Sequence, residues 1–267
     1  MTDKAQIFAR LHAGSDLLIL PNAWDAGSAR VIEHAGAKAI ATSSAAVAWA
    51  HGFPDGELLP PEALLATVRA IARVVEVPVS ADIEAAYAAD AVAAGAFAAR
   101  VIDAGAVGVN IEDGLSPPGL LCAKIEALRR AASRADVDLW INARIDVYLR
   151  RLMEGEAAYI ETIARARSYG AAGASSIFVP GVVDPTLIRN LVADVGLPLN
   201  LLVWPGLPDA ARLKTLGVRR LSAGSGLAKA ALSHTHAMAT AFLETGRSDP
   251  FAVGPLAQTN INTLMKN

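Results

Sequence analysis

The sequence contains little that would suit a secreted, membrane-spanning or nucleic-acid-binding protein. It has a single cysteine, Cys122, so no disulfide can form within the chain, and a reducing, cytoplasmic location is expected. The formal net charge is −2 and no run of Lys or Arg is present, which leaves no electrostatic basis for binding a phosphate backbone. The most apolar stretch, 88–111, is interrupted by charged residues and glycines, and the start of the chain is too polar for a signal peptide. We therefore expect no membrane span, no secretory signal and no nucleic-acid partner.

Aromatic residues are also scarce. They make up 5% of the 267 residues, whereas 53% are hydrophobic, so the apolar content is mostly Ala, Val, Leu and Ile. These residues fill parallel strands and the helices that cover them, which favours an α/β fold over a β-sandwich. No Ser/Gly linker or low-complexity segment divides the chain, and its length suits one large domain.

Short strand-like runs alternate with Ala-rich amphipathic helical stretches along the chain. The strands are predicted at 17–22, 37–43, 78–83, 108–113, 139–145, 175–181, 197–203 and 219–225. Helices are predicted at 24–35, 62–75, 88–104, 121–134, 155–169 and 184–195, and several end at a Gly that caps the helix. Eight strands that alternate with helices predict a closed (β/α)8 barrel, the TIM barrel. We place the barrel at residues 1–246 and a C-terminal helical extension at residues 247–267.

A doubly wound sheet that binds a nucleotide is the structural alternative. Such a sheet usually carries a G-x-G-x-x-G turn after its first strand, and LLILPNAWDAGS at 17–28 lacks that pattern. The AGSG segment at 223–226 is a fragment of such a motif. It predicts a tight turn after the last strand, with a weak phosphate site as the alternative.

Polar residues gather at the carboxyl ends of the predicted strands, whereas the strand starts are mostly apolar. In a parallel barrel the active site lies at the carboxyl ends. We therefore expect the substrate to contact residues that end or follow these strands. They are Trp24, Thr42, Ser43, Ser44, Ala45, Arg144 and Asn200.

Three acids, Asp82, Glu84 and Glu112, end neighbouring strands and are predicted to face the same region. At about 5 Å and an effective dielectric constant of about 20, each pair of carboxylates repels by roughly 3 kcal/mol, so the group needs a cation or a proton. Oxygen ligands without His or Cys suit Mg2+ or Mn2+ rather than Zn2+. The alternative is that these acids form ion pairs with Arg or Lys at the rim of the barrel.

Arg144 lies within an otherwise apolar strand, where an unpaired guanidinium would be costly to bury. It therefore requires an anion. One alternative is a structural ion pair with Asp146 or Glu112, and the other is the carboxylate of a substrate, which a guanidinium binds with two hydrogen bonds. The segment 42–45 offers hydroxyl and backbone N–H groups to the same anion.

From about residue 17 to 245 the chain resembles the isocitrate lyase/phosphoenolpyruvate mutase superfamily. The resemblance is carried by LPNAWDAGSARVIEHAGAKAIATSSAAVAWAHGFPD and then by SADIEAAY, VNIEDG and INARID, in that order. It implies a (β/α)8 barrel that binds Mg2+ and a 2-oxo acid and reacts through an enolate. It also implies that Asp82 binds the metal directly, that Glu84 and Glu112 bind it through water, and that Asp55 is a further outer acid. Thr42 to Ala45 and Arg144 would form the carboxylate pocket, and Asp55, Glu112 and Arg144 would serve catalysis.

Two departures from the family pattern limit what the resemblance implies about the reaction. The D-x-D-T-G-Y-G segment of the family is here Asp82-Ile83-Glu84-Ala85-Ala86-Tyr87, and the Lys-Lys/Arg-Cys-Gly-His loop of the lyases is replaced by GLSPPGLLC at 114–122. The Lys and Asn of the mutase and phosphonopyruvate hydrolase loops are missing too. We take segment 114–122, rich in Gly and Pro, as the lid over the site.

The expected function is a Mg2+-dependent lyase that acts on a small 2-oxo (di)carboxylic acid of the pyruvate, oxaloacetate or 2-oxoglutarate class, by C–C cleavage or decarboxylation. One alternative is a catalytically silent protein that binds a 2-oxo acid. The other is a mutase or hydrolase that processes phosphonopyruvate or phosphoenolpyruvate. Family members exchange C-terminal helices between subunits, so we also expect a homo-oligomer, a dimer or tetramer, in which 247–267 packs on a neighbouring subunit.

Overall fold

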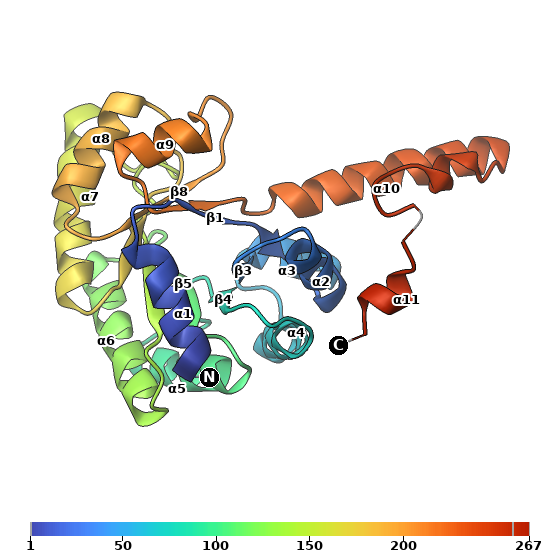
Figure 1. The fold of residues 1–267 in the computed structure, drawn as a ribbon. Coiled ribbons are helices and arrows are strands. Elements are labelled where there is room, and N and C mark those ends of the chain that lie inside the picture. Colours follow the sequence, from blue (N-terminus) through green and yellow to red (C-terminus); the bar gives the residue numbers. More distant parts are fainter. Residues whose placement is uncertain (1, 258, 267) are drawn as a thin grey trace.

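The computed structural model describes residues 2–257 and 259–266 and has the architecture of a (β/α)8 barrel, as predicted (Figure 1). All strands are parallel, and helices surround them. The strands are β1 (Leu18–Leu20), β2 (Asn22–Ala23), β3 (Ile40–Thr42), β4 (Val79–Asp82), β5 (Gly108–Glu112), β6 (Trp140–Arg144), β7 (Ser176–Phe178), β8 (Leu199–Leu202) and β9 (Arg220–Ser222). The helices of the barrel are α1 (Thr2–Ala13), α2 (Ala26–His34), α3 (Ser44–Ala50), α4 (Pro61–Val74), α5 (Ala91–Asp103), α6 (Pro118–Arg134), α7 (Gly155–Ala171), α8 (Pro185–Asp194) and α9 (Ala210–Leu216).

The first predicted strand is divided into β1 and β2 at Pro21, which is why the described residues contain nine strands instead of eight. β1 pairs with β9 and β2 pairs with β3, so the two halves together occupy the position of one barrel strand. Proline has no N–H to donate to a neighbouring strand, and the ladder changes partner at this residue. The sheet order β1-β9-β8-β7-β6-β5-β4-β3-β2 therefore closes through Pro21.

Between the first and the last strand, two helices, α3 and α9, lie outside the predicted helical ranges. Each has seven residues, which is too short for the 3.6-residue periodicity to be distinctive. α3 begins at Ser44, directly after β3, so the predicted turn at 42–45 is in fact the junction of a strand and a helix. α6 begins at Pro118, so the predicted lid 114–122 is non-helical only at 114–117.

The centre of the barrel is polar where barrels usually carry branched apolar residues. Asn142 donates to Asn110 (2.8 Å), and the Arg220 guanidinium also donates to Asn110 (3.1 Å). Ser222 donates to Asn200 (3.1 Å). These side chains are almost fully buried, and the hydrogen bonds among them replace part of the water that they give up on folding. Asn200 Nδ2 and Arg220 Nη1 have no partner among the described residues. Phe8 of α1 packs against Gly108 and Trp140, the first residues of β5 and β6, so α1 lies at the amino end of the barrel.

The C-terminal part leaves the barrel. α10 (Gly226–Thr245) projects outward and is mostly exposed, and it ends at Gly246, which has a positive φ (Figure 1). A 3-10 helix (Asp249–Ala252) and α11 (Ile261–Leu264) follow. Arg30 of α2 donates to the carbonyl oxygen of Leu264 (2.8 Å), which ties α11 to the barrel of the same chain. Among the described residues, we find no helix that is both long enough and apolar enough to cross a membrane.

Candidate active site

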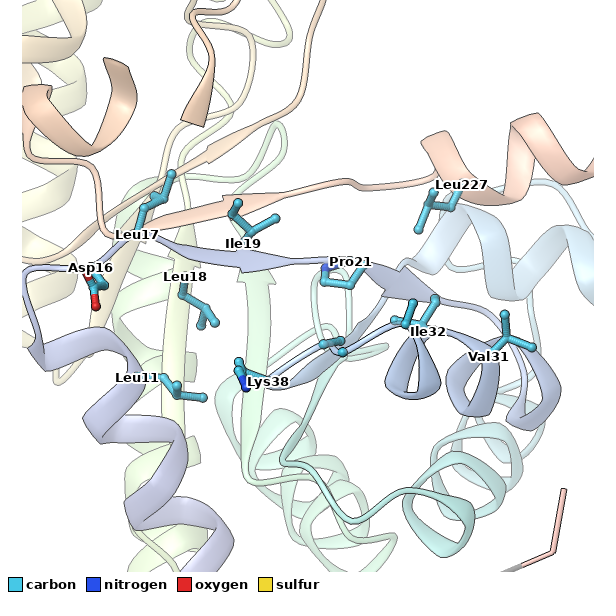
Figure 2. Close-up of a pocket in the computed structure, with 13 residues that line it drawn as sticks. Leu11, Asp16, Leu17, Leu18, Ile19, Pro21, Val31, Ile32, Lys38 and Leu227 are labelled. Carbon is cyan, nitrogen blue, oxygen red and sulfur yellow. The ribbon is translucent and has the colours of Figure 1, made fainter. Parts of the chain in front are cut away.

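A cavity of about 200 Å3 lies at the carboxyl ends of the strands, where the sequence predicts the site. Its lining combines the charged residues Asp55, Asp82 and Arg144 with small polar and apolar residues. The others are Asn22, Ser43, Ser44, Ala45, Asn110, Leu149, Phe178, Pro180, Leu202, Trp204, Ser222, Gly224 and Ser225. A larger cavity of about 700 Å3 lies between β1, α2 and the start of α10 and is lined mainly by apolar residues (Figure 2). The smaller cavity holds the acids and the Arg at the carboxyl ends of the strands and is the candidate active site.

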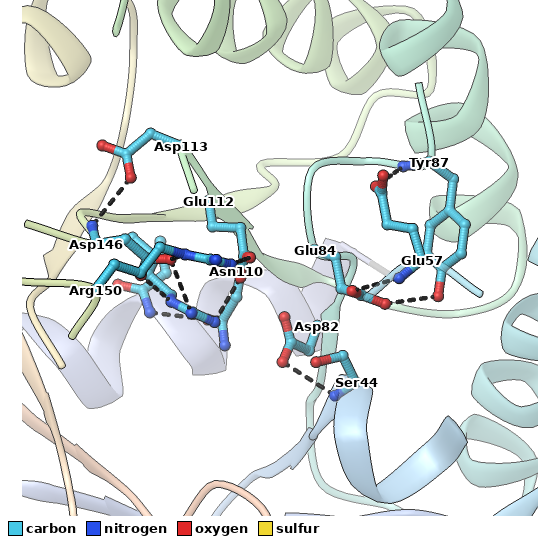
Figure 3. A network of polar contacts seen from close by, with 12 residues as sticks. Ser44, Glu57, Asp82, Glu84, Tyr87, Asn110, Glu112, Asp113, Asp146 and Arg150 are labelled. Atoms are coloured by element: carbon cyan, nitrogen blue, oxygen red, sulfur yellow. Dashed lines mark hydrogen bonds and ion pairs between the residues drawn. The ribbon is translucent and has the colours of Figure 1, made fainter. Parts of the chain in front are cut away.

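Asp82 ends β4 and is fixed by β3 and α3 (Figure 3). Its backbone N–H donates to the Thr42 hydroxyl (2.8 Å), and its Oδ2 accepts from the Ser44 N–H (3.1 Å). Burial raises the pKa of Asp82 above its ordinary value, although the Arg144 charge and the Ser44 hydrogen bond oppose this. Thr42 therefore positions the strand that carries Asp82, and it does not itself line the cavity.

Glu84 lies in a tight segment that directly follows β4. Glu84, Ala86 and Tyr87 all have positive φ (50°, 71° and 49°), which is unfavourable for residues other than Gly. The Glu84 carboxylate accepts from the Tyr87 hydroxyl (2.9 Å) and from the Glu57 N–H (2.7 Å), and Glu57 in turn accepts from the Tyr87 N–H (2.6 Å). Burial raises the pKa of Glu84 to about 7, and the Asp55 and Asp82 charges contribute.

Lys124 of α6 holds this unfavourable segment in place. Its buried ammonium donates to the carbonyl oxygens of Ala85 and Ala88, each at 2.7 Å. Sequence reasoning did not identify it, since a Lys in an amphipathic helix usually faces solvent. Lys124 is thus a positioning residue for Glu84 and Tyr87.

Lys124→Met should lower the free energy of unfolding by about 1.5–3 kcal/mol, because two carbonyls lose a charged donor while the apolar volume is retained. Denaturant unfolding measures this. Arg69→Met, at an exposed position of α4, is the control and should change the stability little. An unchanged stability in Lys124→Met would show that the two hydrogen bonds do not hold the segment.

Glu112 and Arg144 end the adjacent strands β5 and β6 and are paired in register. Arg144 Nη1 lies 2.5 Å from Glu112 Oε2, while Nε and Nη2 donate to the two oxygens of Asp146 (2.6 and 3.0 Å). Arg150 donates to the same Asp146 carboxylate (2.8 Å). Burial raises the pKa of Glu112 to about 8 against the opposing charge of Arg144, and the carboxylates of Glu112 and Asp146 raise the pKa of Arg144 despite its burial. Both predicted partners of Arg144 are therefore present.

Asp113, the residue after Glu112, helps to hold Arg144 in position. It is fully buried and accepts from Arg165 (2.8 Å), from the Tyr169 hydroxyl (2.8 Å) and from the Asp146 N–H (3.0 Å). Since Asp146 binds Arg144 through both oxygens, Asp113 fixes the position of Arg144 through the Asp146 backbone.

The donor set fits Mg2+. Among the described residues, no group of three or more Asp, Glu, His or Cys side chains is arranged to hold a metal ion on its own. Mg2+ does not require such a group, because it is usually held by one or two carboxylates together with water and substrate oxygens. Asp82 lines the cavity. Glu84 and Glu112 do not line it, but they lie near enough to Asp82 for its charge to raise the pKa of each. Asp55 and Asp82 thus offer carboxylates at the cavity, and Glu84 and Glu112 lie around them. The division into direct and water-mediated ligands stays a prediction.

The structure brings most of the predicted site residues together. Asp55, Ser43, Ser44, Ala45, Asp82 and Arg144 line one cavity. Trp24 packs against the core instead, and Asn200 is fully buried with its oxygen bonded to Ser222, so neither lines the cavity. The AGSG turn contributes Gly224 and Ser225 to the lining, but the Gly224 N–H already donates to Asn22 (2.8 Å).

The residues from β7, β8 and the segment after β6 were missed. Leu149, Phe178, Pro180, Leu202 and Trp204 line the cavity although none is polar. A search restricted to polar strand ends cannot find them. The sequence does contain a signal for them, because the strands β7 and β8 end in apolar residues whereas the others end in polar ones.

Comparison with known proteins places the chain among enzymes of this fold. Residues 8–243 match the family model described as phosphoenolpyruvate phosphomutase. A solved structure from Burkholderia cenocepacia J2315, described as that of a candidate phosphonomutase, is 40% identical to the chain. It has a TM-score of 0.85, and the match covers 89% of this chain and 99% of that one.

Two further proteins carry named activities. Oxaloacetate decarboxylase 1 of Pseudomonas fluorescens (strain Pf0-1) is 27% identical over 240 residues, which cover 88% of this chain and 83% of that protein. A phosphonopyruvate hydrolase, solved in complex with oxalate and Mg2+, is 24% identical with a TM-score of 0.86, and the match covers 98% of this chain and 95% of that one. The second likeness concerns the fold alone.

Proposed function

The chain belongs to the phosphoenolpyruvate phosphomutase family, within the isocitrate lyase/phosphoenolpyruvate mutase superfamily, and we propose that it is a Mg2+-dependent lyase acting on a small 2-oxo acid. The reaction would cleave or form a C–C bond beside the carbonyl, by aldol-type lysis or by decarboxylation. The observation that carries this proposal is that Asp82 and Arg144 line the same cavity at the carboxyl ends of the strands. Asp82 would hold the cation directly, and Arg144 would bind the substrate carboxylate.

The described residues supply separate places for the carboxylate and for the 2-oxo group of a 2-oxo acid. Ser43, Ser44 and Ala45 line the cavity from the start of α3, next to Asp82. Arg144 is held rigidly by Asp146, so its guanidinium is oriented before a substrate arrives, which reduces the entropy lost on binding. A bound Mg2+ would supply positive charge to an oxygen on which negative charge develops as the C–C bond breaks.

Turnover separates this proposal from its main alternative, a silent 2-oxo acid binder. The first experiment is a panel of pyruvate, oxaloacetate and 2-oxoglutarate, in which thermal stabilisation is measured with and without Mg2+. A ligand present at about a hundred times its Kd should add roughly 2.7 kcal/mol to the stability. If no 2-oxo acid stabilises the protein in the presence of Mg2+, the proposal fails. If one binds and is never converted, the chain is a binding protein.

The affinity for Mg2+ should rise between about pH 6 and pH 8. The pKa of Glu84 is raised to about 7 and that of Glu112 to about 8, so both hold protons at the lower pH and must release them to accept hydrogen bonds from water around a cation. Each released proton gives up to about a tenfold change in affinity per pH unit below its pKa. Calorimetric titration at several pH values measures this, and Glu112→Gln should remove one of the two steps. An affinity independent of pH would contradict it.

The same two groups give the metal-free protein the opposite trend in stability. A carboxyl whose pKa is raised on folding binds its proton more tightly in the folded state. The free energy of unfolding should therefore fall as the pH rises from the ordinary value of 4.5 through about 8. Added Mg2+ should flatten this decline.

We also propose that the protein is a homo-oligomer, at least a dimer, as the resemblance implies. In a single chain α10 projects away from the barrel (Figure 1). It buries little more than Ala228 and leaves Leu232, Phe242 and Leu243 exposed. On the same chain, Ile19 of β1 is 57% exposed and lines the 700 Å3 cavity with Leu17 and Leu227 (Figure 2). Strand β1 thus lacks the covering that a barrel helix gives, and α10 of a second copy would supply it.

Light scattering at micromolar concentration should give at least twice the chain mass of 27.7 kDa. Leu232→Glu should shift the protein toward the monomer, because it places a charge in the apolar contact. Ser233→Glu, next to it on α10 and also exposed, is the matched control. A monomeric wild-type protein would refute the proposal.

A further inference from the structure

The lining of the active-site cavity differs on its two sides. From β9 through β2 to β6 the strand ends and the segments after them contribute polar and charged residues, including Ser222, Ser43, Asp82 and Arg144. From β7 and β8 and the segment after β6 they contribute Leu149, Phe178, Pro180, Leu202 and Trp204, which we call the apolar arc. Counting β1 and β2 as one strand, β8 is four positions from β4 in a ring of eight, so the apolar arc faces Asp82 across the barrel.

The backbone of the apolar arc has few free N–H groups to offer an anion. The Val179 N–H donates to the Asn200 carbonyl (3.1 Å), and the Val203 N–H donates to the Ser222 carbonyl (2.9 Å). The Phe178 side chain is 5% exposed and Leu202 is half-buried at the end of β8. A substrate group placed here would contact aliphatic and aromatic carbon.

The cavity lining leaves no cationic side chain for a second anion. Arg144 is the sole Lys, Arg or His among the described residues that line the cavity, and it is already paired with Glu112 and Asp146. Arg150 is paired with Asp146. Arg220 is 1% exposed and does not line the cavity; it bonds to Asn110 and Ser222, and its Nη1 has no partner among the described residues. A carboxylate or phosphonate placed against the apolar arc would lose its hydration without gaining a cationic partner, which is unfavourable.

We infer that the apolar arc is the subsite for the substrate's second end, and that it takes an uncharged hydrocarbon group. The inference rests on the proposed function, because it takes the 2-oxo acid end to lie between Asp82 and Arg144. The substrate class is then a monocarboxylic 4-hydroxy-2-oxo acid with a short branched alkyl or aryl tail, which aldol-type lysis converts to pyruvate and an aldehyde, instead of a dicarboxylic or phosphonic acid. A volume of about 200 Å3 is that of about seven waters at roughly 30 Å3 each, which is room for a small acid of this kind.

The decisive experiment compares acids of matched shape that differ in the charge of the tail. 5-Methyl-2-oxohexanoate has an isopropyl group where 2-oxoglutarate has a carboxylate, and 4-methyl-2-oxopentanoate is related to oxaloacetate in the same way. Calorimetry with the wild-type protein and Mg2+ should give at least a tenfold lower Kd for 5-methyl-2-oxohexanoate than for 2-oxoglutarate. Equal affinity, or tighter binding of 2-oxoglutarate, would overturn the inference.

A charge added to the apolar arc should reverse the preference. Leu202→Arg supplies the missing cation, so 2-oxoglutarate should gain at least tenfold in affinity and 5-methyl-2-oxohexanoate should lose affinity. Leu202→Met, the control, keeps an apolar side chain of similar volume and should keep the wild-type preference. If Leu202→Arg does not fold, Trp204→Arg, at a partly exposed position of the same arc, makes the same test. A preference unchanged by the added Arg would remove the arc from the binding site.

Pyruvate distinguishes failure of this inference from failure of the proposed function. It carries the 2-oxo acid end and has a methyl group in place of a tail. If pyruvate binds in the presence of Mg2+ and the matched acids show no difference, the inference alone is overturned. If neither pyruvate nor any longer acid binds, the proposed function is overturned, and the inference falls with it.

Discussion

Asp82→Ala should abolish Mg2+ binding and turnover while the barrel remains folded. Asp82 ends β4, lines the cavity and lies among the other acids, and it is the proposed direct ligand. Loss of residues that act around a metal typically weakens its binding by about 10–100-fold, and we expect a direct ligand to exceed this. Calorimetry should therefore show at least a hundredfold weaker Mg2+ binding.

The barrel should tolerate this change because burying the Asp82 carboxylate without a metal ion is itself unfavourable. Burial raises the pKa of Asp82, and the nearby Asp55 charge adds to the effect, so removing the group relieves desolvation and repulsion together. The loss is one acceptor for the Ser44 N–H, which is worth about 1 kcal/mol. Metal-free stability should thus stay within about 1 kcal/mol of the wild type.

Asp82→Asn separates the charge of Asp82 from its shape, and Asp103→Ala tests whether the loss of any acid lowers the Mg2+ affinity. Asp82→Asn keeps an oxygen for the Ser44 N–H and removes the charge, so it should lose Mg2+ as Asp82→Ala does. Asp103→Ala removes an exposed acid at the end of α5 and should leave Mg2+ binding intact. Unchanged Mg2+ affinity in Asp82→Ala would rule out the metal site as assigned.

The sequence was sufficient to predict the barrel and the polar side of its cavity. The polar strand ends occur at Asp82, Glu112 and Arg144, and parallel strands bring their carboxyl ends to one edge, so these residues could be expected to meet. The split at Pro21 could have been foreseen from the missing N–H, but which neighbour each half pairs with depends on how the whole barrel closes.

The supporting contacts could not be predicted, because they depend on partners distant in the sequence. Lys124 reaches carbonyls 36 and 39 residues away, and Asp113 meets Arg165 across 52 residues. Neither residue belongs to a motif, and each looks like an ordinary charged surface residue in its own segment. For a similar reason the sequence leaves open which carboxylate pairs with Arg144, since Asp146 is two residues away and Glu112 lies on another strand.

Arg144→Lys should impair both 2-oxo acid binding and stability. Arg144 uses three nitrogens, two for Asp146 and one for Glu112, and it also lines the cavity. A Lys ammonium keeps the charge but cannot contact both carboxylates and a substrate in the same planar geometry. Loss of one charge-assisted hydrogen bond to the ligand should weaken 2-oxo acid binding by about ten- to a hundredfold, or roughly 1.5–3 kcal/mol.

The stability of Arg144→Lys should fall by a similar amount, because Glu112 or Asp146 loses a buried partner. Arg165→Lys is the matched control. Arg165 also pairs with two carboxylates, Asp113 and Glu161, but it does not line the cavity, so its change should lower the melting temperature and leave ligand affinity within a few fold. Mg2+ binding should survive in both variants, since neither removes a carboxylate. If Arg144→Lys behaves like Arg165→Lys, with lower stability and unchanged affinity, Arg144 serves the structure alone and the substrate carboxylate binds elsewhere in the cavity.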